Sequence, residues 1–209
     1  MSEGPSRRVV FGVLGAAVVL MLTVTAVLFT REIARIREEK ARRSEIMGEV
    51  PDFSLTDQTG RRVGRSDLLG KVTLVGFMFT RCSGPCGDLT SQMARLQSDW
   101  REIDDVQLVS ISVDPTVDTR DVLAGYASRA GAIDGKWMFL TGEEDRVVDL
   151  VKKGFRAPIA PSVGEHEILH SERFAVVDRV GRIRAYIDGK SEDVVMATRP
   201  IVRRLMAEN

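Results

Sequence analysis

Residues 72–100, VTLVGFMFTRCSGPCGDLTSQMARLQSDW, form the stretch of sequence that decides the fold. The stretch begins as an apolar run rich in β-branched and aromatic residues, which is typical of a buried strand. A turn with both cysteines of the chain, Cys82 and Cys86, follows. Apolar residues then recur at helical spacing as far as Trp100. The pattern predicts a strand, a tight turn and a helix, with two thiols at the turn.

Outward from this stretch, strand-like and helix-like patterns alternate along the chain. A hairpin is expected at 53–63, and single strands are expected at 106–113 and 137–140. One helix is expected to start at Asp118–Thr119, and another is expected to run from a capping box at Thr141 to Gly154. They are followed by a Pro/Gly-rich loop of about fifteen residues, a hairpin at 173–187, and a last helix that opens at Ser191 and is interrupted at Pro200. A βαβ beginning and a ββα ending predict an α/β protein with a thioredoxin-like core.

Composition narrows the classes of partner. The chain has 209 residues with 30 Lys and Arg against 30 Asp and Glu, so no overall field favours nucleic acid. Two cysteines cannot build a disulfide framework, and a lone close pair is better interpreted as a redox or metal pair. We therefore expect no nucleic-acid partner.

An uncharged run near the N-terminus predicts a membrane anchor. Residues 9–29 are long enough for the ~20 apolar residues that a membrane-spanning helix needs. A cleaved signal peptide, a twin-arginine signal at Arg7–Arg8 and a buried core helix are the alternatives. The predicted organisation is a short tail over 1–8, a transmembrane helix over 9–29, a charged stalk over 30–50 and a folded domain over 51–209.

The cysteine turn has the features of a reactive site. Pro85 suits the first turn of a helix, which puts Cys86 in that turn and Cys82 in the loop before it. The helix dipole and unpaired N–H groups favour a thiolate there. The pair could close a disulfide or bind a soft metal, and two ordinary buried cysteines are the plainer alternative.

The two histidines of the chain both lie in the segment HEILH, residues 166–170. The segment matches the H-E-x-x-H motif of zinc proteases, but that site needs a long helix and a third ligand. We interpret His166 as a solvated loop residue. In a thioredoxin-like core the segment that holds His170 lies beside the cysteine turn. Two thiolates and one imidazole make a donor set that suits copper.

These residues together resemble the Sco/SenC family of membrane-anchored, copper-binding cytochrome c oxidase assembly proteins. The matching pieces are PDFSLTDQTG, LLGKVTLVGFMFTRC, CSGPC, SVDPTVDTRDVLAGYA, WMFLTG and LHSERFAVVDRVGRI. The resemblance implies a thioredoxin fold that holds one copper, as Cu(I) or Cu(II), through Cys82, Cys86 and His170. It also implies delivery of copper to, or reduction of the cysteines of, the copper A site in oxidase subunit II.

The chain departs from the family where proline commonly follows each cysteine. Ser83 and Gly87 stand at those positions, and the proline of this turn is Pro85. The departure bears on affinity and redox poise but removes no ligand. Asp114 ends the second strand at the edge where α/β sites form, and it could orient a ligand or simply end the strand before a proline.

Two other functions remain open alongside copper delivery without turnover of a small-molecule substrate. One is a thiol–disulfide oxidoreductase that uses Cys82 and Cys86 as a reversible pair. The other is a peroxidase, which would need one thiol acidified by a cation such as Arg81.

The expected orientation places the folded domain outside the cytoplasm. Copper delivery to an exported oxidase domain and stable use of a disulfide both favour that face of a bacterial inner membrane. Six Lys and Arg in residues 31–43, against two before the apolar run, predict the opposite orientation by the positive-inside rule.

Overall fold

The computed structural model describes residues 20–33, 35, 46–81, 86–161 and 168–208. The chain divides into two compact units, 1–45 and 46–209. In the first unit, residues 20–33 form a helix. No helix within the described ranges has both the length and the apolarity needed to cross a membrane. Residues 9–19 of the predicted anchor lie outside those ranges.

The second unit is built on an eight-stranded sheet. Its strands, in spatial order, are β1 (Gly48–Glu49), β10 (Arg182–Asp188), β9 (Arg173–Val177), β4 (Val72–Met78), β5 (Val106–Ser112), β6 (Trp137–Thr141), β2 (Ser54–Asp57) and β3 (Arg62–Gly64). The central strands β4, β5 and β6 are parallel, and all other neighbours are antiparallel. A separate hairpin pairs β7 (Ile159–Pro161) with β8 (Ile168–His170).

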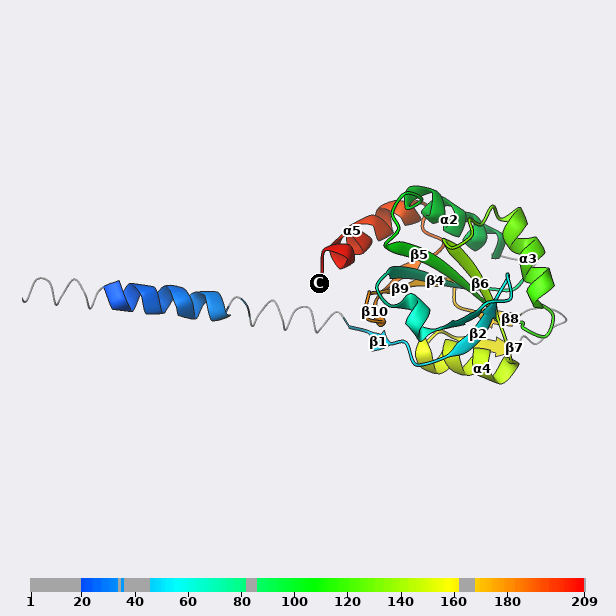
Figure 1. The fold of residues 1–209 in the computed structure, drawn as a ribbon, viewed down its shortest axis with the longest axis horizontal. Helices are drawn as coiled ribbons and strands as arrows, with labels where there is room; N and C mark the ends of the chain where they lie inside the picture. Colours follow the sequence, from blue (N-terminus) through cyan, green and yellow to red (C-terminus); the bar gives the residue numbers. More distant parts are fainter. Residues whose placement is uncertain (1–19, 34, 36–45, 82–85, 162–167, 209) are drawn as a thin grey trace, which may run out of the picture. The chain divides into compact units, whose positions relative to one another are not determined.

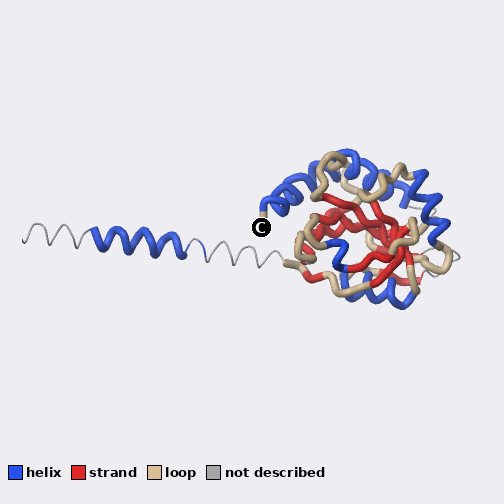
Figure 2. Tube along the Cα trace, viewed as in Figure 1, coloured by secondary structure: helices blue, strands red, loops and turns tan. Residues whose placement is uncertain are grey.

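Helices cover both faces of the sheet (Figures 1 and 2). On one face lie α2 (Cys86–Asp99), α3 (Arg120–Arg129) and α5 (Val194–Ala207). On the other lie α4 (Glu144–Asp149) and the π-helical turn η2 (Leu150–Gly154) that continues it. A short 3₁₀ turn, η1 (Arg65–Leu68), leads from β3 towards β4.

Burial on both faces explains why the sequence of the central strand β4 is almost entirely apolar. Leu74 and Met78 of β4 pack in the core under α2, α3 and α5. Val75, Phe77 and the following Phe79 alternate with them and pack in the core under α4. A strand covered on both faces has no solvent side to keep polar, so it lacks the usual alternation. The predicted strand is β4, in the middle of the sheet, and the predicted helix is α2, which packs on one face of it.

The last helix differs from its prediction at both of its markers. It begins at Val194 rather than Ser191, because the Asp193 side chain caps it by accepting a hydrogen bond from a first-turn N–H. It also continues through Pro200 without the expected interruption. The buried side chains of Val194 and Val202, on either side of the proline, both pack on the sheet. That packing offsets the backbone hydrogen bond that a proline cannot make.

Two other expectations were wrong at the level of single residues. Thr141 does not cap α4, because it pairs with Thr56 in the sheet, and the N-cap is Glu143, whose side chain makes no capping bond. The long loop predicted after Gly154 contains the strands β7 and β8, so His170 belongs to a strand. Gly154 ends the helical segment as expected.

The folded unit begins before the expected boundary at Pro51. Residues 48–49 form β1, which pairs with β10 at the edge of the sheet. Val50 is fully buried in the core under α4. These contacts join residues 46–50, assigned to the stalk from their sequence, to the second unit.

Candidate metal site

In the sequence, Cys82 lies between β4 and α2, and Cys86 is the first residue of α2. Cys86 is the first residue of α2, so its backbone lies at the end where the helix dipole favours an anion. Residues 82–85, which include Cys82, and the side chain of Cys86 lie outside the described part of the structure.

His170 reaches the end of β4 from the β7–β8 hairpin. Its side chain is buried, and its ring meets the ring of Phe79 edge-on, with centroids 5.7 Å apart and planes at 89°. Phe79 follows β4 directly and precedes Cys82 by three residues. His170 therefore contacts the residue that lies three positions before Cys82 in the chain.

The protonation of His170 suits metal binding. Its Nδ1 lies 3.0 Å from the carbonyl oxygen of Ser171, so Nδ1 donates and the neutral ring carries its lone pair on Nε2. Burial lowers the pKa of His170, although the Ser171 carbonyl and the charge of Glu172 act in the opposite direction. The neutral imidazole is the form that ligates metals.

A buried carboxylate holds the chain just before the cysteine turn. Asp118 is fully buried and accepts hydrogen bonds from the backbone N–H of Thr80 at 3.0 Å and from its hydroxyl. It also accepts from the hydroxyl of Ser112, the last residue of β5, at 2.6 Å. Sequence reasoning treated Asp118 only as a helix-start residue. The N-cap of α3 is Thr119, the other residue expected to start this helix.

Asp114 contacts the residue next to Cys82. Its carboxylate lies 3.0 Å from the guanidinium of Arg81 and accepts a hydrogen bond from Thr116. The side chain of Arg81 is 47% exposed, so the ion pair is partly screened by solvent. A peroxidase that relied on Arg81 to acidify a thiol would share that charge with Asp114, which weakens this alternative.

The zinc-protease motif does not form its helix. Residues 168–170 of the motif form β8 and not a helix, whereas two histidines four residues apart hold one zinc ion when a helix brings them together. His166 lies outside the described residues. Within the ranges that the structure describes, no three metal-ligating side chains gather into a cluster.

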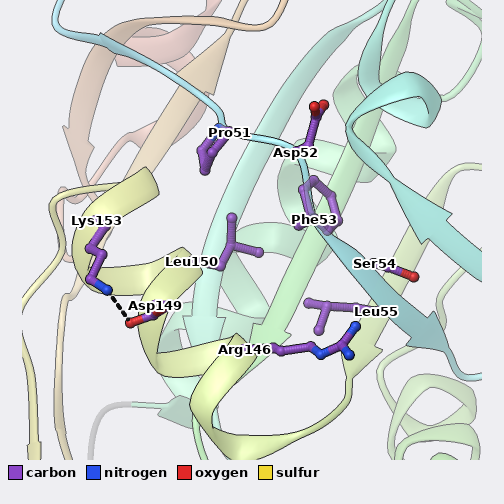
Figure 3. Close-up of a pocket in the computed structure, with 9 residues that line it drawn as sticks. All are labelled: Pro51, Asp52, Phe53, Ser54, Leu55, Arg146, Asp149, Leu150 and Lys153. Atoms are coloured by element: carbon purple, nitrogen blue, oxygen red, sulfur yellow. Dashed lines mark ion pairs between the residues drawn. The ribbon is translucent and has the colours of Figure 1, made fainter.

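A cavity of about 360 Å³ lies between the chain entering β2 and helix α4 (Figure 3). Its lining residues are Pro51, Asp52, Phe53, Ser54, Leu55, Arg146, Asp149, Leu150 and Lys153. Two of its charged groups, Lys153 and Asp149, are paired with each other at 2.8 Å. None of the residues singled out from the sequence lines this cavity, so the cysteine turn remains the candidate site.

Solved structures of known proteins share this architecture. A SCO1/SenC family lipoprotein from Bacillus anthracis is 32% identical, with a TM-score of 0.69 over 77% of this chain and 96% of its own. BsSco, described as a member of the Sco family of cytochrome c oxidase assembly proteins with a disulfide switch, is 28% identical, with a TM-score of 0.67 over 78% and 95% of the two chains.

A third structure, ScoI of Bradyrhizobium japonicum with copper bound, is 26% identical, with a TM-score of 0.58 over 73% of this chain and 99% of its own. The predicted thioredoxin-like α/β fold is confirmed by these similarities. The sequence profile of the SCO1/SenC family matches residues 41–205, nearly the whole folded unit. The chain belongs to the SCO1/SenC family.

Proposed function

We propose that this protein is a membrane-anchored copper chaperone that binds one copper ion through Cys82, Cys86 and His170. In this proposal it helps to assemble the copper A site in subunit II of cytochrome c oxidase. It carries copper as cargo and turns over no small-molecule substrate. The proposal rests chiefly on one observation, the contact of the buried His170 ring with Phe79 at the end of the strand that leads to Cys82.

The chemistry of the donors supports copper as the cargo. Two thiolates and a neutral imidazole form a soft set that favours copper among the available metals. The lone pair of the neutral His170 ring is on Nε2, the nitrogen opposite the one that donates to Ser171. A family member with copper bound, ScoI of Bradyrhizobium japonicum, adopts the same fold.

Metal analysis of the full chain, purified in detergent, tests the three ligands. The parent protein should bind about one Cu(I) per chain. Cys82→Ser, Cys86→Ser and His170→Ala should each weaken binding by at least 100-fold, since each removes a donor from a three-donor site. His166→Ala is the matched control, because it removes the other histidine of the same segment. A His170→Ala protein that binds copper like the parent would show that the ligand set is wrong.

The client and the location are also part of the proposal. BsSco is described as belonging to a family of oxidase assembly proteins, and the Bacillus anthracis relative is described as a lipoprotein. Both descriptions agree with an exported protein attached to a membrane. Here the apolar residues 9–29 would be the anchor, with the folded unit on the outer side of the bacterial inner membrane. A reporter enzyme fused after Asn209 that is active only in the cytoplasm would refute this orientation.

Thiol–disulfide exchange is the second candidate function. The position of Cys86 at the first residue of α2 favours its thiolate, the form that attacks a disulfide. In such a reaction the two thiols lose two electrons and two protons to the client disulfide and become a disulfide themselves. The activity should survive His170→Ala and removal of copper. Loss of reduction in that variant would favour the copper function alone.

A further inference from the structure

We propose that Asp118 is a positioning residue, whose buried carboxylate fixes the chain at the end of β4 and thereby sets the copper affinity and the redox potential of the Cys82–Cys86 pair. The inference rests on the proposed function of these cysteines. It concerns a side chain that is not one of the proposed ligands and acts through Thr80.

The carboxylate joins three segments that are distant in the sequence. Thr80 belongs to the chain leaving β4, Ser112 ends β5, and Asp118 itself precedes α3. The backbone N–H and the hydroxyl of Thr80 and the hydroxyl of Ser112 all donate to the two oxygens of Asp118. Three donors on one fully buried carboxylate leave little freedom for the backbone at Thr80.

The position of Thr80 gives this restraint its effect on the site. Phe79, on one side of Thr80, contacts the ring of His170. Arg81, on the other side, pairs with Asp114 and is followed by Cys82. The same backbone segment therefore includes the residue that contacts the proposed ligand His170 and leads directly to the proposed ligand Cys82. A shift at Thr80 would alter the distance between them.

The strength of the restraint is large enough to measure. Hydrogen bonds to a charged group are stronger than those between neutral groups, and a buried partner left unsatisfied is destabilising. Asp118→Asn replaces an oxygen that accepts by an amide that donates, so at least one of the converging donors would face another donor. The segment at Thr80 must then move or lose a bond.

The test compares Asp118→Asn with Asp57→Asn in the full chain in detergent. Asp57 is the control, because it is also a buried carboxylate that accepts backbone and hydroxyl hydrogen bonds, but at the end of β2, where it also pairs with Arg61. Both variants should lose stability. Only Asp118→Asn should weaken Cu(I) binding by roughly tenfold, measured by competition with bicinchoninic acid.

The redox readout needs no metal. The metal-free protein is equilibrated with reduced and oxidised dithiothreitol, which supplies two electrons and two protons to the Cys82–Cys86 disulfide and forms its own cyclic disulfide. Asp118→Asn should make the protein disulfide easier to reduce by roughly tenfold, about 30 mV for a two-electron couple. A less restrained pair of thiols closes its disulfide less readily.

Thr80→Val keeps the test decisive if Asp118→Asn does not fold. It removes the hydroxyl from the other side of the contact and leaves the carboxylate and its charge in place. Thr80→Ser should restore the parent values, since it retains the hydroxyl. If Thr80→Val and Asp118→Asn both behave like Asp57→Asn, Asp118 is only structural and the inference is overturned. If the parent binds no copper or His170→Ala has no effect, it is the proposed function that fails.

Discussion

Two buried carboxylates lie at opposite ends of the central strands, which we call the Asp178 edge and the Asp118 edge, and they are held in different ways. Asp178 follows β9 near the start of β4, and it pairs with the guanidinium groups of Arg182 at 2.8 Å and Arg184 at 3.0 Å. Asp118 lies beyond the end of β4, and its partners are a backbone N–H and two hydroxyl groups. One carboxylate is held by charges and the other by neutral donors.

The two edges have different expected roles. Arg184 also pairs with Glu208 at the end of α5, so the Asp178 cluster fastens the last helix to the sheet. The neutral partners of Asp118 add no positive charge beside the cysteine turn, where a cation would change the acidity of the thiols. The Asp178 edge should therefore govern stability, and the Asp118 edge should govern the chemistry of the site.

The largest effect is expected from breaking the cluster of charges. Arg184→Met should lower the free energy of unfolding by about 3 kcal/mol, because it leaves Asp178 and Glu208 without their shared buried cation. Urea unfolding measures the loss. Arg62→Met, at an exposed position, is the control and should change stability by no more than about 0.5 kcal/mol. Copper binding by the folded fraction of Arg184→Met should match the parent, and a large loss there would contradict the separation of the two edges.

A pair of phenylalanines on β4 and its extension tests the other edge. Phe79→Leu and Phe77→Leu both replace a buried ring in the same core, and each should cost about 1 kcal/mol of stability. Only Phe79 contacts His170, whereas Phe77 contacts Phe155. An edge-on ring contact contributes about 0.5–1.5 kcal/mol, so Phe79→Leu should weaken Cu(I) binding roughly fivefold. Equal copper affinities in the two variants would show that the ring contact does not position the histidine.

Acid should weaken the Asp178 edge. Burial alone would raise the pKa of Asp178, but hydrogen bonds from the backbone and side chain of Arg182, from Arg184 and from the backbone of Val180 outweigh it and hold that pKa below its ordinary value of 3.8. A lowered pKa contributes stability above the ordinary value, and the contribution is lost as the pH falls through 3.8 and below. The slope of unfolding free energy against pH should be smaller in Asp178→Asn than in the parent. An unchanged slope would contradict this role.

The sequence was sufficient for the parts of the fold with continuous burial. β4 and β5 are buried on both faces, so each is a mostly apolar run that stands out from its surroundings. The prediction for His170 came from topology, since the thioredoxin-like order brings its segment to the edge where parallel strands end, and its described contact there is with Phe79. The apolar runs have a cause within one stretch of chain, whereas the placement of His170 depends on the order of the strands.

The missed features depend on contacts between distant segments. An Asp–Thr pair before a helix is typical of a cap, and only the folded chain turns Asp118 towards Thr80 and Ser112. Strands of three residues, such as β7 and β8, are too short to show a period. A proline inside a helix usually kinks or ends it. Here Pro200 lies within α5, and the packing of α5 on the sheet has no signature in the sequence near the proline.

The smallest expected effect is the loss of the Thr119 cap, and it distinguishes the role of Thr119 from that of its neighbour Asp118. Thr119 caps α3 by accepting a hydrogen bond from the backbone N–H of Val122 at 3.4 Å, a long bond, so Thr119→Ala should cost only about 0.5 kcal/mol in urea unfolding. Asp193→Ala, which removes the cap of α5 with its bond of 3.0 Å, should cost about 1 kcal/mol. Neither should change the dithiothreitol equilibrium of the cysteines. Since Thr119 is next to Asp118, a shift in Thr119→Ala would mean that the start of α3, and not the carboxylate alone, controls the cysteine turn.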